Sequence, residues 1–461
     1  MTFSALDLKP ALLDNLAGLG YLQMTPIQSR SLPPILAGQD VIGQAKTGSG
    51  KTAAFGLGLL NTLDSSNFRT QALVLCPTRE LADQVAVELR RLARGIPNIK
   101  ILTVCGGKPF RIQAASIDSG AHIVVGTPGR IEDHLRKSTL ELAELTTLVL
   151  DEADRMLDMG FQDSLDYIVG QTPAKRQTLL FSATYPDEIQ SIAGRVLTTP
   201  VHIKVEETHG NATIRQQFFE VQDDEQRLRA LRLLLLENQA ESTLVFCNTK
   251  VETRDVAGAL RQAGFSVLAI HGDLEQRDRD STLVRFAHKS VSVLVATDVA
   301  ARGLDIDALD VVINYRIAHE SEIHLHRIGR TGRAGGSGVA CTLFSASEAH
   351  KVAALQEYTG TTVAVRPLPD DSVLKRSPGQ PAMESLQIDG GKKQKIRPGD
   401  ILGALTGDNG IAGDQVGKIS IFDMRSFVAV RRSVAAQAVK KLMLGKLKGK
   451  SFRVRQLRGH P

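Results

Sequence analysis

The fold is decided by one stretch, Ala45-Lys46-Thr47-Gly48-Ser49-Gly50-Lys51-Thr52. The run Asp40-Val41-Ile42 precedes it, and the small-residue helical pattern Ala53-Ala54-Phe55-Gly56-Leu57 follows it. A strand, a glycine loop and a helix in this order suit phosphate binding, because glycines let backbone N–H groups crowd around an anion at the positive end of the helix. We expect Lys51 to reach the β- and γ-phosphates of a nucleotide and the Thr52 hydroxyl to bind Mg²⁺.

A second motif supports this interpretation. Ala45 stands where the general pattern has its first glycine, so the loop alone leaves open a glycine-rich turn without a ligand. Asp151-Glu152-Ala153-Asp154 follows the apolar run Leu148-Val149-Leu150, and carboxylates at the end of a parallel strand suit Mg²⁺. We expect Asp151 to hold the metal and Glu152 to orient or deprotonate the attacking water; the alternative is an ordinary acidic helix start.

Short apolar runs alternate with helical patterns along most of the chain, which is typical of α/β units with parallel sheets. Polar or proline-rich breaks interrupt this pattern near residues 206–211, 366–371 and 377–381, and they predict domains at 1–207, 214–365 and 382–458. The expected strands lie at residues 72–76, 99–104, 123–125, 148–150, 178–181, 243–246, 267–270, 293–295 and 311–313.

Composition excludes several classes of protein. The chain has 461 residues, of which 42% are hydrophobic and 23% charged, as in ordinary globular proteins. Its four scattered cysteines include no C-x-x-C pair, which argues against a zinc site or a disulfide framework and favours reduced thiols. We find no apolar run near the ~18 residues of a membrane span and no signal-peptide pattern at the start, so we expect a cytoplasmic protein.

The positive charge is concentrated at the end of the chain. Residues 382–461 hold 16 Lys+Arg and 6 Asp+Glu, a net charge of +10, whereas the whole chain carries +6. Such asymmetry suggests a nucleic-acid-binding appendix, with a solvated basic surface as the alternative. The order strand, helix, strand, strand, helix, strand from Glu384 onward is the ferredoxin-like pattern of RNA-recognition modules.

The usual stacking aromatics of such modules are missing, since Lys418-Ile419-Ser420-Ile421 stands where the sheet surface would carry them. We therefore expect Phe422 and Phe427 to be core residues. RNA binding by charge and loop shape is expected instead from Lys392, Lys393, Lys395, Lys446, Lys448, Lys450, Arg453 and Arg455.

A cluster of arginines occupies His326-Arg327-Ile328-Gly329-Arg330-Thr331-Gly332-Arg333. Three arginines at a spacing of three, interleaved with glycines, make a poor core helix, and their guanidinium groups can aim at phosphate oxygens. The cluster predicts arginine fingers supplied within one chain, with an exposed basic helix end as the alternative.

With these motifs in view, the chain resembles the DEAD-box RNA helicases from about Phe3 to Phe344. The motifs of that family occur in order: Phe3 with Gly20-Tyr21 and Thr25-Pro26-Ile27-Gln28, the phosphate loop, Pro77-Thr78-Arg79-Glu80-Leu81, Gly106-Gly107, Thr127-Pro128-Gly129-Arg130, Asp151-Glu152-Ala153-Asp154, Ser182-Ala183-Thr184, Val245-Phe246-Cys247-Asn248-Thr249, Gln276 with Arg279, Ala296-Thr297-Asp298 with Ala301-Arg302-Gly303-Leu304-Asp305, and the arginine cluster.

The resemblance implies a role for each matching residue. Gln28 would read the adenine edge while Phe3 stacks on the base, and Asp305 would bind the ribose. Catalysis would use Lys51, Asp151, Glu152, Arg330 and Arg333, with Mg²⁺ on Thr52 and Asp151. The implied ATP-binding residues are Phe3, Gln28, Ala45, Thr47, Gly48, Ser49, Gly50, Lys51, Thr52, Gly303 and Asp305.

The resemblance also implies an RNA path and its coupling to the nucleotide. RNA would lie along Arg79, Gly106, Gly107, Thr127, Arg130, Arg279 and Thr297, which offer backbone and side-chain donors to a sugar-phosphate chain rather than base-specific contacts. Coupling to ATP would involve Asp154, Ser182, Thr184 and His326.

The implied architecture is α/β: two tandem RecA-like parallel-sheet P-loop domains, followed by a C-terminal α+β RRM-like domain that binds RNA. The appendix is similar to that of the DbpA branch, which implies ATP-driven, Mg²⁺-dependent local unwinding of a large-subunit (23S) ribosomal RNA hairpin region in the pre-ribosomal large subunit. We expect a monomer without membrane contact. Two alternatives remain: a general RNA chaperone or mRNA helicase with a non-specific basic tether, and an ATP-gated RNA clamp with little turnover.

Overall fold

The computed structural model describes residues 2–45, 48–205, 214–301, 309–332 and 338–457, apart from the side chain of Val299. The chain divides into two compact units, Met1–His209 and Gly210–Pro461. We describe each unit by itself. No helix in these ranges is both long and apolar enough to cross a membrane.

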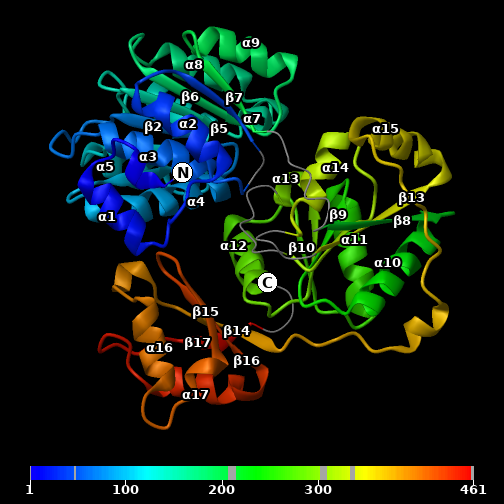
Figure 1. Ribbon diagram of the computed structural model, residues 1–461. Helices are drawn as coiled ribbons and strands as arrows, with labels where there is room; N and C mark the ends of the chain where they lie inside the picture. The colour runs from blue at the N-terminus through cyan, green and yellow to red at the C-terminus, as the bar shows by residue number, and fades with distance from the viewer. Residues whose placement is uncertain (1, 46–47, 206–213, 302–308, 333–337, 458–461) are drawn as a thin grey trace. The chain divides into compact units, whose positions relative to one another are not determined.

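The first unit is built on a parallel sheet in the order β3-β4-β2-β5-β6-β1-β7 (Figure 1). Its core strands are continuous apolar runs, and both faces of the sheet are buried, as expected for parallel strands between helices. In β2, for example, Ala72 and Val74 pack on one face, and Leu73 and Leu75 pack on the other. The strands are β1 (Val41–Gln44), β2 (Ala72–Leu75), β3 (Ile101–Val104), β4 (Ile123–Gly126), β5 (Thr147–Asp151), β6 (Gln177–Ser182) and β7 (Val201–Lys204).

Helices cover both faces of this sheet. Side chains of α1 to α4 contribute to the apolar cluster on one face, and those of α5 to α9 contribute to the cluster on the other. The helices are α1 (Pro10–Gly18), α2 (Pro26–Leu36), α3 (Lys51–Thr62), α4 (Arg79–Leu92), α5 (Phe110–Asp118), α6 (Pro128–Arg136), α7 (Ala153–Asp158), α8 (Gln162–Gly170) and α9 (Asp187–Val196).

The strand order divides the carboxyl edge of this sheet into two halves. The phosphate loop follows β1, Ser182-Ala183-Thr184 lies at the end of β6, and Asp151 ends β5, and these three strands are neighbours. Arg79, Gly106 and Thr127 follow β2, β3 and β4, which are the neighbours at the other side. The fold therefore gathers the predicted nucleotide residues at β5-β6-β1 and the predicted RNA residues at β3-β4-β2.

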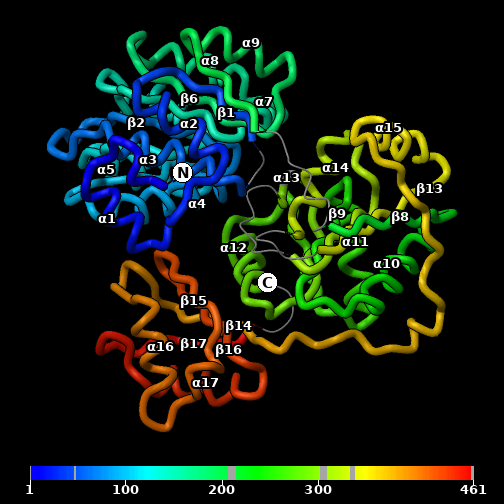
Figure 2. The backbone as a smooth tube through the Cα atoms, viewed as in Figure 1, coloured from blue at the N-terminus to red at the C-terminus, as the bar shows by residue number. Residues whose placement is uncertain are grey.

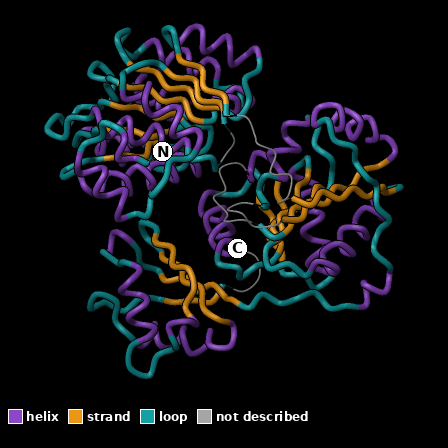
Figure 3. The backbone as a smooth tube through the Cα atoms, in the orientation of Figure 1, coloured by secondary structure: helices purple, strands orange, loops and turns teal. Residues whose placement is uncertain are grey.

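The second unit contains a parallel sheet in the order β10-β11-β9-β12-β13-β8. Its strands are β8 (Ile214–Val221), β9 (Thr243–Cys247), β10 (Val267–Ile270), β11 (Val293–Thr297), β12 (Val311–Asn314) and β13 (Gly338–Ser345). The accompanying helices are α10 (Asp224–Asn238), α11 (Lys250–Gln262), α12 (Gln276–Ala287), α13 (Asp298–Ala301), α14 (Ser321–Ile328) and α15 (Ala349–Thr359). Figure 3 shows the strands of this sheet between its helices.

The same unit also contains a separate antiparallel sheet in the order β15-β16-β14-β17. Its strands are β14 (Met383–Ile388), β15 (Val416–Ile421), β16 (Ser426–Arg431) and β17 (Val454–Gln456), with α16 (Pro398–Thr406) and α17 (Ala435–Leu444) between them in sequence (Figure 2). Leu386, Ile401, Val428 and Leu442 share one buried cluster, so both helices pack on one face of this sheet.

The predicted architecture is therefore confirmed: two parallel α/β sheets are followed by an α+β module with the ferredoxin-like element order. Each expected strand is present, and the run at 267–270 coincides with β10. The expectation that Phe422 and Phe427 are core residues is wrong in part: Phe427 is fully buried, but it lies on the sheet face opposite the cluster that α16 and α17 cover. Phe422 is half-buried and meets Phe427 edge to face at 5.5 Å between ring centroids. The predicted domain limits at 207, 214, 365 and 382 stay predictions.

Candidate nucleotide and RNA site

The phosphate loop is held by glycine geometry and by its own lysine. Gly50, which caps α3, has φ +94°, and a Cβ there would lie 2.5 Å from Gln28 Nε2, so the position requires glycine. Lys51 is 6% exposed and donates from Nζ to the carbonyl of Ala45 at 2.6 Å. Ser49 Oγ is buried without a hydrogen-bond partner among the described residues. The lysine thus lies within the loop, and a donor hydroxyl remains available there.

Gln28 lies against this loop from α2. Its Nε2 donates to the Gly50 carbonyl at 3.1 Å, and its Oε1 accepts from the Thr25 backbone N–H at 2.9 Å in a capping box. The amide is therefore already oriented at the loop, with one further hydrogen on Nε2. Phe3 is 4% exposed and packs edge to face on Tyr21 at 6.1 Å. Its stacking on a base stays a prediction.

Asp151 is a buried carboxylate with a missing partner. It is 2% exposed, and its Oδ1 has no hydrogen-bond partner among the described residues. Burial raises the pKa of Asp151 to about 7, although the nearby Lys51 charge acts in the opposite direction. An unpartnered, buried carboxylate oxygen at the end of a strand beside β6 and β1 fits Mg²⁺, which takes one or two protein oxygens together with nucleotide phosphates, and Thr52 stays the predicted second ligand.

The next two acidic residues are held in different ways. Glu152 adopts the left-handed conformation, with φ 52° and ψ 54°, which is uncommon and costly for a residue with a side chain. This turn carries the chain from β5 into α7 and sets the carboxylate beside Asp151. Asp154 is buried, and its Oδ2 accepts from the backbone N–H groups of Ala183 and Thr184 at 3.2 and 3.1 Å and from Thr184 Oγ1 at 3.0 Å.

These bonds connect the first turn of α7 directly with the segment that follows β6. Burial alone would raise the pKa of Asp154, but Arg155, Lys51 and the Thr184 backbone donor bring that pKa below its usual range, so the carboxylate is ionised. The structure thus joins Asp154 to Thr184 and places the buried Ser182 at the end of the same strand. The coupling role of these residues stays a prediction.

At the β3-β4-β2 half, an arginine lies over a pair of glycines. Arg79 begins α4 behind the capping hydroxyl of Thr78, which accepts from the Leu81 N–H at 3.2 Å. A Cβ on Gly106 would lie 2.9 Å from Arg79 Nη2, and Gly107 has φ +79° and approaches the same guanidinium. The two motifs, 27 residues apart in sequence, thus form one surface of backbone and guanidinium donors.

The remaining predicted RNA residues belong to both units, where they lie on helices or directly at their starts and at the end of a strand. Thr127 caps α6, and Arg130, one turn further on, lies 5.9 Å from the Phe110 ring centroid and 3.7 Å from Asp133 Oδ2. In the second unit, Arg279 lies in the first turn of α12, and Thr297 ends β11. Thr47, Gly303, Asp305 and Arg333 lie outside the described residues, and their roles stay predictions.

The described residues of the arginine cluster fall into a buried part and a partly exposed part. Arg327 is 2% exposed: its Nε and Nη2 donate to the two oxygens of Asp298, both at 2.7 Å, and Nη2 also donates to Asn248 Oδ1 at 2.8 Å. A buried guanidinium with these partners belongs to the scaffold of this sheet edge. The predicted fingers are Arg330 and Arg333, and their role stays a prediction. His326 and Arg330 are partly exposed on and just after the same helix, α14.

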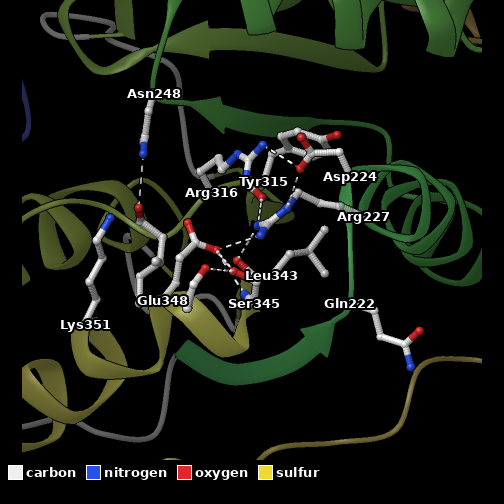
Figure 4. Close-up of polar contacts among 12 residues, drawn as sticks. Gln222, Asp224, Arg227, Asn248, Tyr315, Arg316, Leu343, Ser345, Glu348 and Lys351 are labelled. Atoms are coloured by element: carbon white, nitrogen blue, oxygen red, sulfur yellow. Dashed lines mark hydrogen bonds and ion pairs between the residues drawn. The ribbon is translucent and has the colours of Figure 1, made fainter.

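A second buried arginine closes the same edge of this sheet (Figure 4). Arg227 donates from Nη1 to the carbonyls of Tyr315 and Leu343 at 2.8 and 3.1 Å, and from Nη2 to Glu348 at 2.6 Å. Arg316 joins α10 to α11 by donating to Asp224 and Glu252 at 2.6 and 2.7 Å. No sequence motif includes Arg227 or Arg316, and the partner of Arg227 lies 121 positions away along the chain.

In the C-terminal module, the eight predicted basic side chains are all exposed. They occupy two loops and the start of β17, and the register brings these segments together: Ile388 pairs with Val454, and the Asp389 N–H donates to the Arg453 carbonyl at 3.0 Å. Lys448 in the second loop contacts Asp400 at 3.1 Å, at the start of the helix that follows the first loop. The charges therefore gather at one end of the sheet.

The sheet face opposite α16 and α17 has neighbours of its own. His288, just after α12, lies 3.1 Å from Ser385 Oγ and 3.2 Å from Ser420 Oγ, and Arg425 Nη2 lies 4.0 Å from Asp280. Burial lowers the pKa of His288 to about 3, so the imidazole is neutral at this contact. A face used in this way is consistent with the expectation that RNA binds through the loops.

Three family models match the chain: DEAD/DEAH box helicase over residues 25–192, helicase conserved C-terminal domain over 226–335, and DbpA RNA binding domain over 385–456. The ATP-dependent RNA helicase DbpA of Escherichia coli (strain K12) is 55% identical over 457 residues, which cover 99% of each chain. The DEAD-box ATP-dependent RNA helicase CshA of Bacillus cereus is 43% identical over 358 residues, 78% of this chain and 68% of that protein.

Solved structures of RNA helicases resemble this chain in fold as well as in sequence. S. cerevisiae Dbp5 bound to RNA and ADP BeF3 matches with a TM-score of 0.72 and 29% identity, over 81% of this chain and 98% of that chain. Mss116p bound to ssRNA and AMP-PNP matches with a TM-score of 0.71 and 27% identity, over 79% of this chain and 78% of that chain. The chain therefore belongs to the DEAD-box family and is an RNA-dependent ATPase and ATP-dependent RNA helicase of the DbpA branch.

Proposed function

We propose that this helicase remodels large-subunit (23S) ribosomal RNA during assembly of the pre-ribosomal large subunit. The C-terminal module grips an RNA hairpin, and the two parallel-sheet domains open a neighbouring duplex at the expense of ATP. The observation that carries this proposal is the gathering of eight exposed basic side chains at one end of the C-terminal sheet, which suits a folded RNA element. The match of residues 385–456 to the DbpA RNA binding domain supports the same assignment.

The proposed hydrolytic step uses the β5-β6-β1 half of the first sheet. Lys51 leaves the Ala45 carbonyl and binds the β- and γ-phosphates, so that its charge offsets the charge that develops on the transferred group. Glu152 orients or deprotonates the attacking water from its strained turn. Thr52 and Asp151 would hold Mg²⁺, which supplies charge neutralisation when bound.

Nucleotide recognition is proposed to come from both sheets. Gln28 reads the adenine edge with the amide hydrogen that the loop does not use, and Phe3 stacks on the base. Gly303 and Asp305 bind the ribose side, and Arg330 and Arg333 act as arginine fingers. This division makes the site complete only when the two domains close, which couples ATP binding to RNA binding.

The coupling is proposed to run through Asp154. Its carboxylate already holds Thr184, at the end of the strand beside the phosphate loop. Movement of this segment on nucleotide binding would reach Ser182 on one side and, after closure, His326 on the other. RNA then lies along Arg79, Gly106, Gly107, Thr127 and Arg130 of the first domain and Arg279 and Thr297 of the second, and its bending opens a few base pairs.

The proposal includes three domains, 1–207, 214–365 and 382–458, acting as a monomer. A cytoplasmic location is part of it, because the four cysteines are free and buried, as suits a reducing compartment.

The test compares ATPase stimulation by large-subunit ribosomal RNA fragments with stimulation by unrelated RNA of equal length. The full chain carrying Lys392→Ala, Lys393→Ala and Lys395→Ala should lose its preference for the ribosomal fragment and keep its unstimulated ATPase. A matched control with Lys375→Ala, Arg376→Ala and Lys440→Ala removes the same charge from exposed positions elsewhere and should keep the preference.

An unchanged preference in the loop variant would contradict the proposal and favour a general RNA helicase with a non-specific tether. Single-turnover ATPase measurements address the other alternative. Fast hydrolysis with RNA bound is expected, whereas ATP that remains intact on the RNA complex would indicate a clamp.

A further inference from the structure

Gln113 connects three separate parts of the first domain. It lies on α5 and is 5% exposed, although no motif includes it. Its Nε2 donates to the Cys105 carbonyl at 2.7 Å, immediately before the Gly106-Gly107 turn. Its Oε1 accepts from Arg130 Nη1 at 3.4 Å and from His134 Nε2 at 3.3 Å. One carboxamide therefore joins the glycine turn to the guanidinium on α6.

His134 is the third residue that contacts the Gln113 side chain. It is fully buried, its ring stacks on Phe110 at 4.1 Å between centroids, and its Nδ1 lies 2.8 Å from Thr139 Oγ1. Burial lowers the pKa of His134 to about 4, so the ring is neutral. The Thr139 hydroxyl also donates to the His134 carbonyl at 3.1 Å. Because the Gln113 amide oxygen can only accept, its contact with the ring requires the tautomer that carries the proton on Nε2.

Two partners with fixed roles determine which way the Gln113 amide points. Arg130 can only donate and the Cys105 carbonyl can only accept, so the amide oxygen must face Arg130 and His134, and the amide nitrogen must face Cys105. A reversed amide would oppose donors to donors and acceptor to acceptor. The side chain is thus locked in the one orientation that holds the turn and the arginine together.

We propose that Gln113 is a positioning residue for RNA, which fixes the Gly106-Gly107 turn and the Arg130 guanidinium at the separation that successive phosphates of one strand require. The inference rests on the RNA path of the proposed function. Gln113 itself, being buried, does not touch RNA. Because Gln113 already orders the Arg130 side chain and the glycine turn in the free protein, less conformational entropy is lost when the RNA strand binds.

The experiment compares four variants of the full chain. Gln113→Met keeps the length of the side chain and removes all three bonds, and Gln113→Glu keeps the acceptor for Arg130 and His134 but not the donor to Cys105. Arg130→Ala removes the guanidinium itself. Gln190→Met, at an exposed glutamine of α9, is the matched control.

The readouts are the RNA concentration that half-saturates ATPase, the dependence of RNA affinity on salt, the KM for ATP and the melting temperature. For Gln113→Met we expect the half-saturating RNA concentration to rise about tenfold, the size of one charge-assisted hydrogen bond, with kcat at saturating RNA and the KM for ATP unchanged. The slope of log K against log salt should fall by about 0.7, the value of one phosphate contact on a single strand.

A merely structural glutamine would lower the melting temperature without changing this slope. Arg130→Ala should lower the slope by the same amount, and the double variant should lower it no further, because both changes remove one contact. Gln113→Glu should recover part of the lost affinity, and Gln190→Met should behave as the unmodified protein.

Two results would overturn the inference, and they differ. If Arg130→Ala weakens RNA binding but Gln113→Met leaves affinity and slope unchanged, the positioning role is wrong and the RNA path stands. If Arg130→Ala itself leaves RNA binding unchanged, the proposed RNA path fails, and the inference fails with it.

Discussion

The carboxyl edges of the two parallel sheets treat their buried charges in opposite ways. At the first sheet, Asp151 is buried with an oxygen that has no hydrogen-bond partner among the described residues, and its pKa is raised. At the second sheet, Arg327 and Arg227 are just as buried, but each guanidinium donates to a carboxylate and to further oxygens.

This difference separates a ligand site from a scaffold. A buried charge with full partners, such as Arg327, stabilises the fold only while each partner remains, and it has no donor to offer a ligand. Arg227 is similar, except that its buried Nε has no hydrogen bond among the described residues. A buried charge without a partner costs free energy until a ligand supplies one, so such groups mark binding sites. The unpartnered Asp151 at the first edge is thus what the proposed nucleotide and Mg²⁺ site requires, whereas the fully partnered Arg327 at the second edge supports the partly exposed residues around it.

The largest expected effect concerns Glu152, at the first edge. Glu152→Gln should lower kcat for ATP hydrolysis about 10²–10⁴-fold, the usual contribution of a general base, and should leave RNA bound in the presence of ATP. Steady-state ATPase and retention of labelled RNA measure the two effects. Normal turnover in this variant would remove Glu152 from the mechanism.

Arg327 tests the scaffold side of the comparison. Arg327→Met removes a buried guanidinium and leaves the half-buried Asp298 beside an apolar side chain, which should cost about 3 kcal/mol of unfolding free energy. Urea denaturation of the full chain measures this, with the exposed Arg376→Met as the control. A loss below about 1 kcal/mol would contradict a scaffold role, since surface substitutions stay within that range.

Asp151 tests the opposite expectation, that a buried ligand-binding residue destabilises the folded protein while no ligand is bound. Because its pKa is raised in the folded state to about 7, the folded protein loses stability as pH rises from about 4 through 7. Asp151→Asn cannot ionise and should be more stable at pH 8, on the order of 2–4 kcal/mol, while losing ATPase activity. Denaturation without nucleotide or Mg²⁺ measures this; a destabilised variant would mean that Asp151 is a structural partner instead.

His324 is an exception at the second sheet and gives the smallest effect. It is buried against Phe218, and neither ring nitrogen has a hydrogen-bond partner in the described structure. Burial and Arg327 lower its pKa to about 3, so stability is present above pH 6.5 and is lost as pH falls toward 3.

His324→Phe should remove about 1 kcal/mol of stability change per pH unit between pH 6 and pH 4, since one proton fewer is linked to unfolding. Melting temperatures of the two proteins across this range measure the effect. Parallel pH profiles would contradict a neutral buried His324.

Much of this architecture follows from the sequence because its signals are local. Continuous apolar runs predict parallel strands, and the expected strand at 267–270 is β10 itself. Motif residues follow directly after strands, so strand order alone brings Asp151, Ser182 and the phosphate loop together. The basic character of the loops at 390–395 and 446–450 is likewise a local property.

What the sequence could not show depends on partners that are distant along the chain. The motif gives Arg327 no role of its own, and only its contact with Asp298 assigns it to the scaffold. Arg227 requires Glu348, and Gln113 requires both Cys105 and Arg130. Gln28 was expected to read a base, whereas its bonds to Gly50 and Thr25 became visible only in the fold.

The central claim is that one sheet edge holds the nucleotide at β5-β6-β1 and RNA at β3-β4-β2. Its most direct test is the affinity for a fluorescent ATP analogue, without RNA, of Lys51→Ala and Arg79→Ala in the full chain. We predict that Lys51→Ala weakens nucleotide binding at least tenfold, whereas Arg79→Ala stays within twofold of the unmodified protein. An equal loss in both variants would contradict the division of the edge.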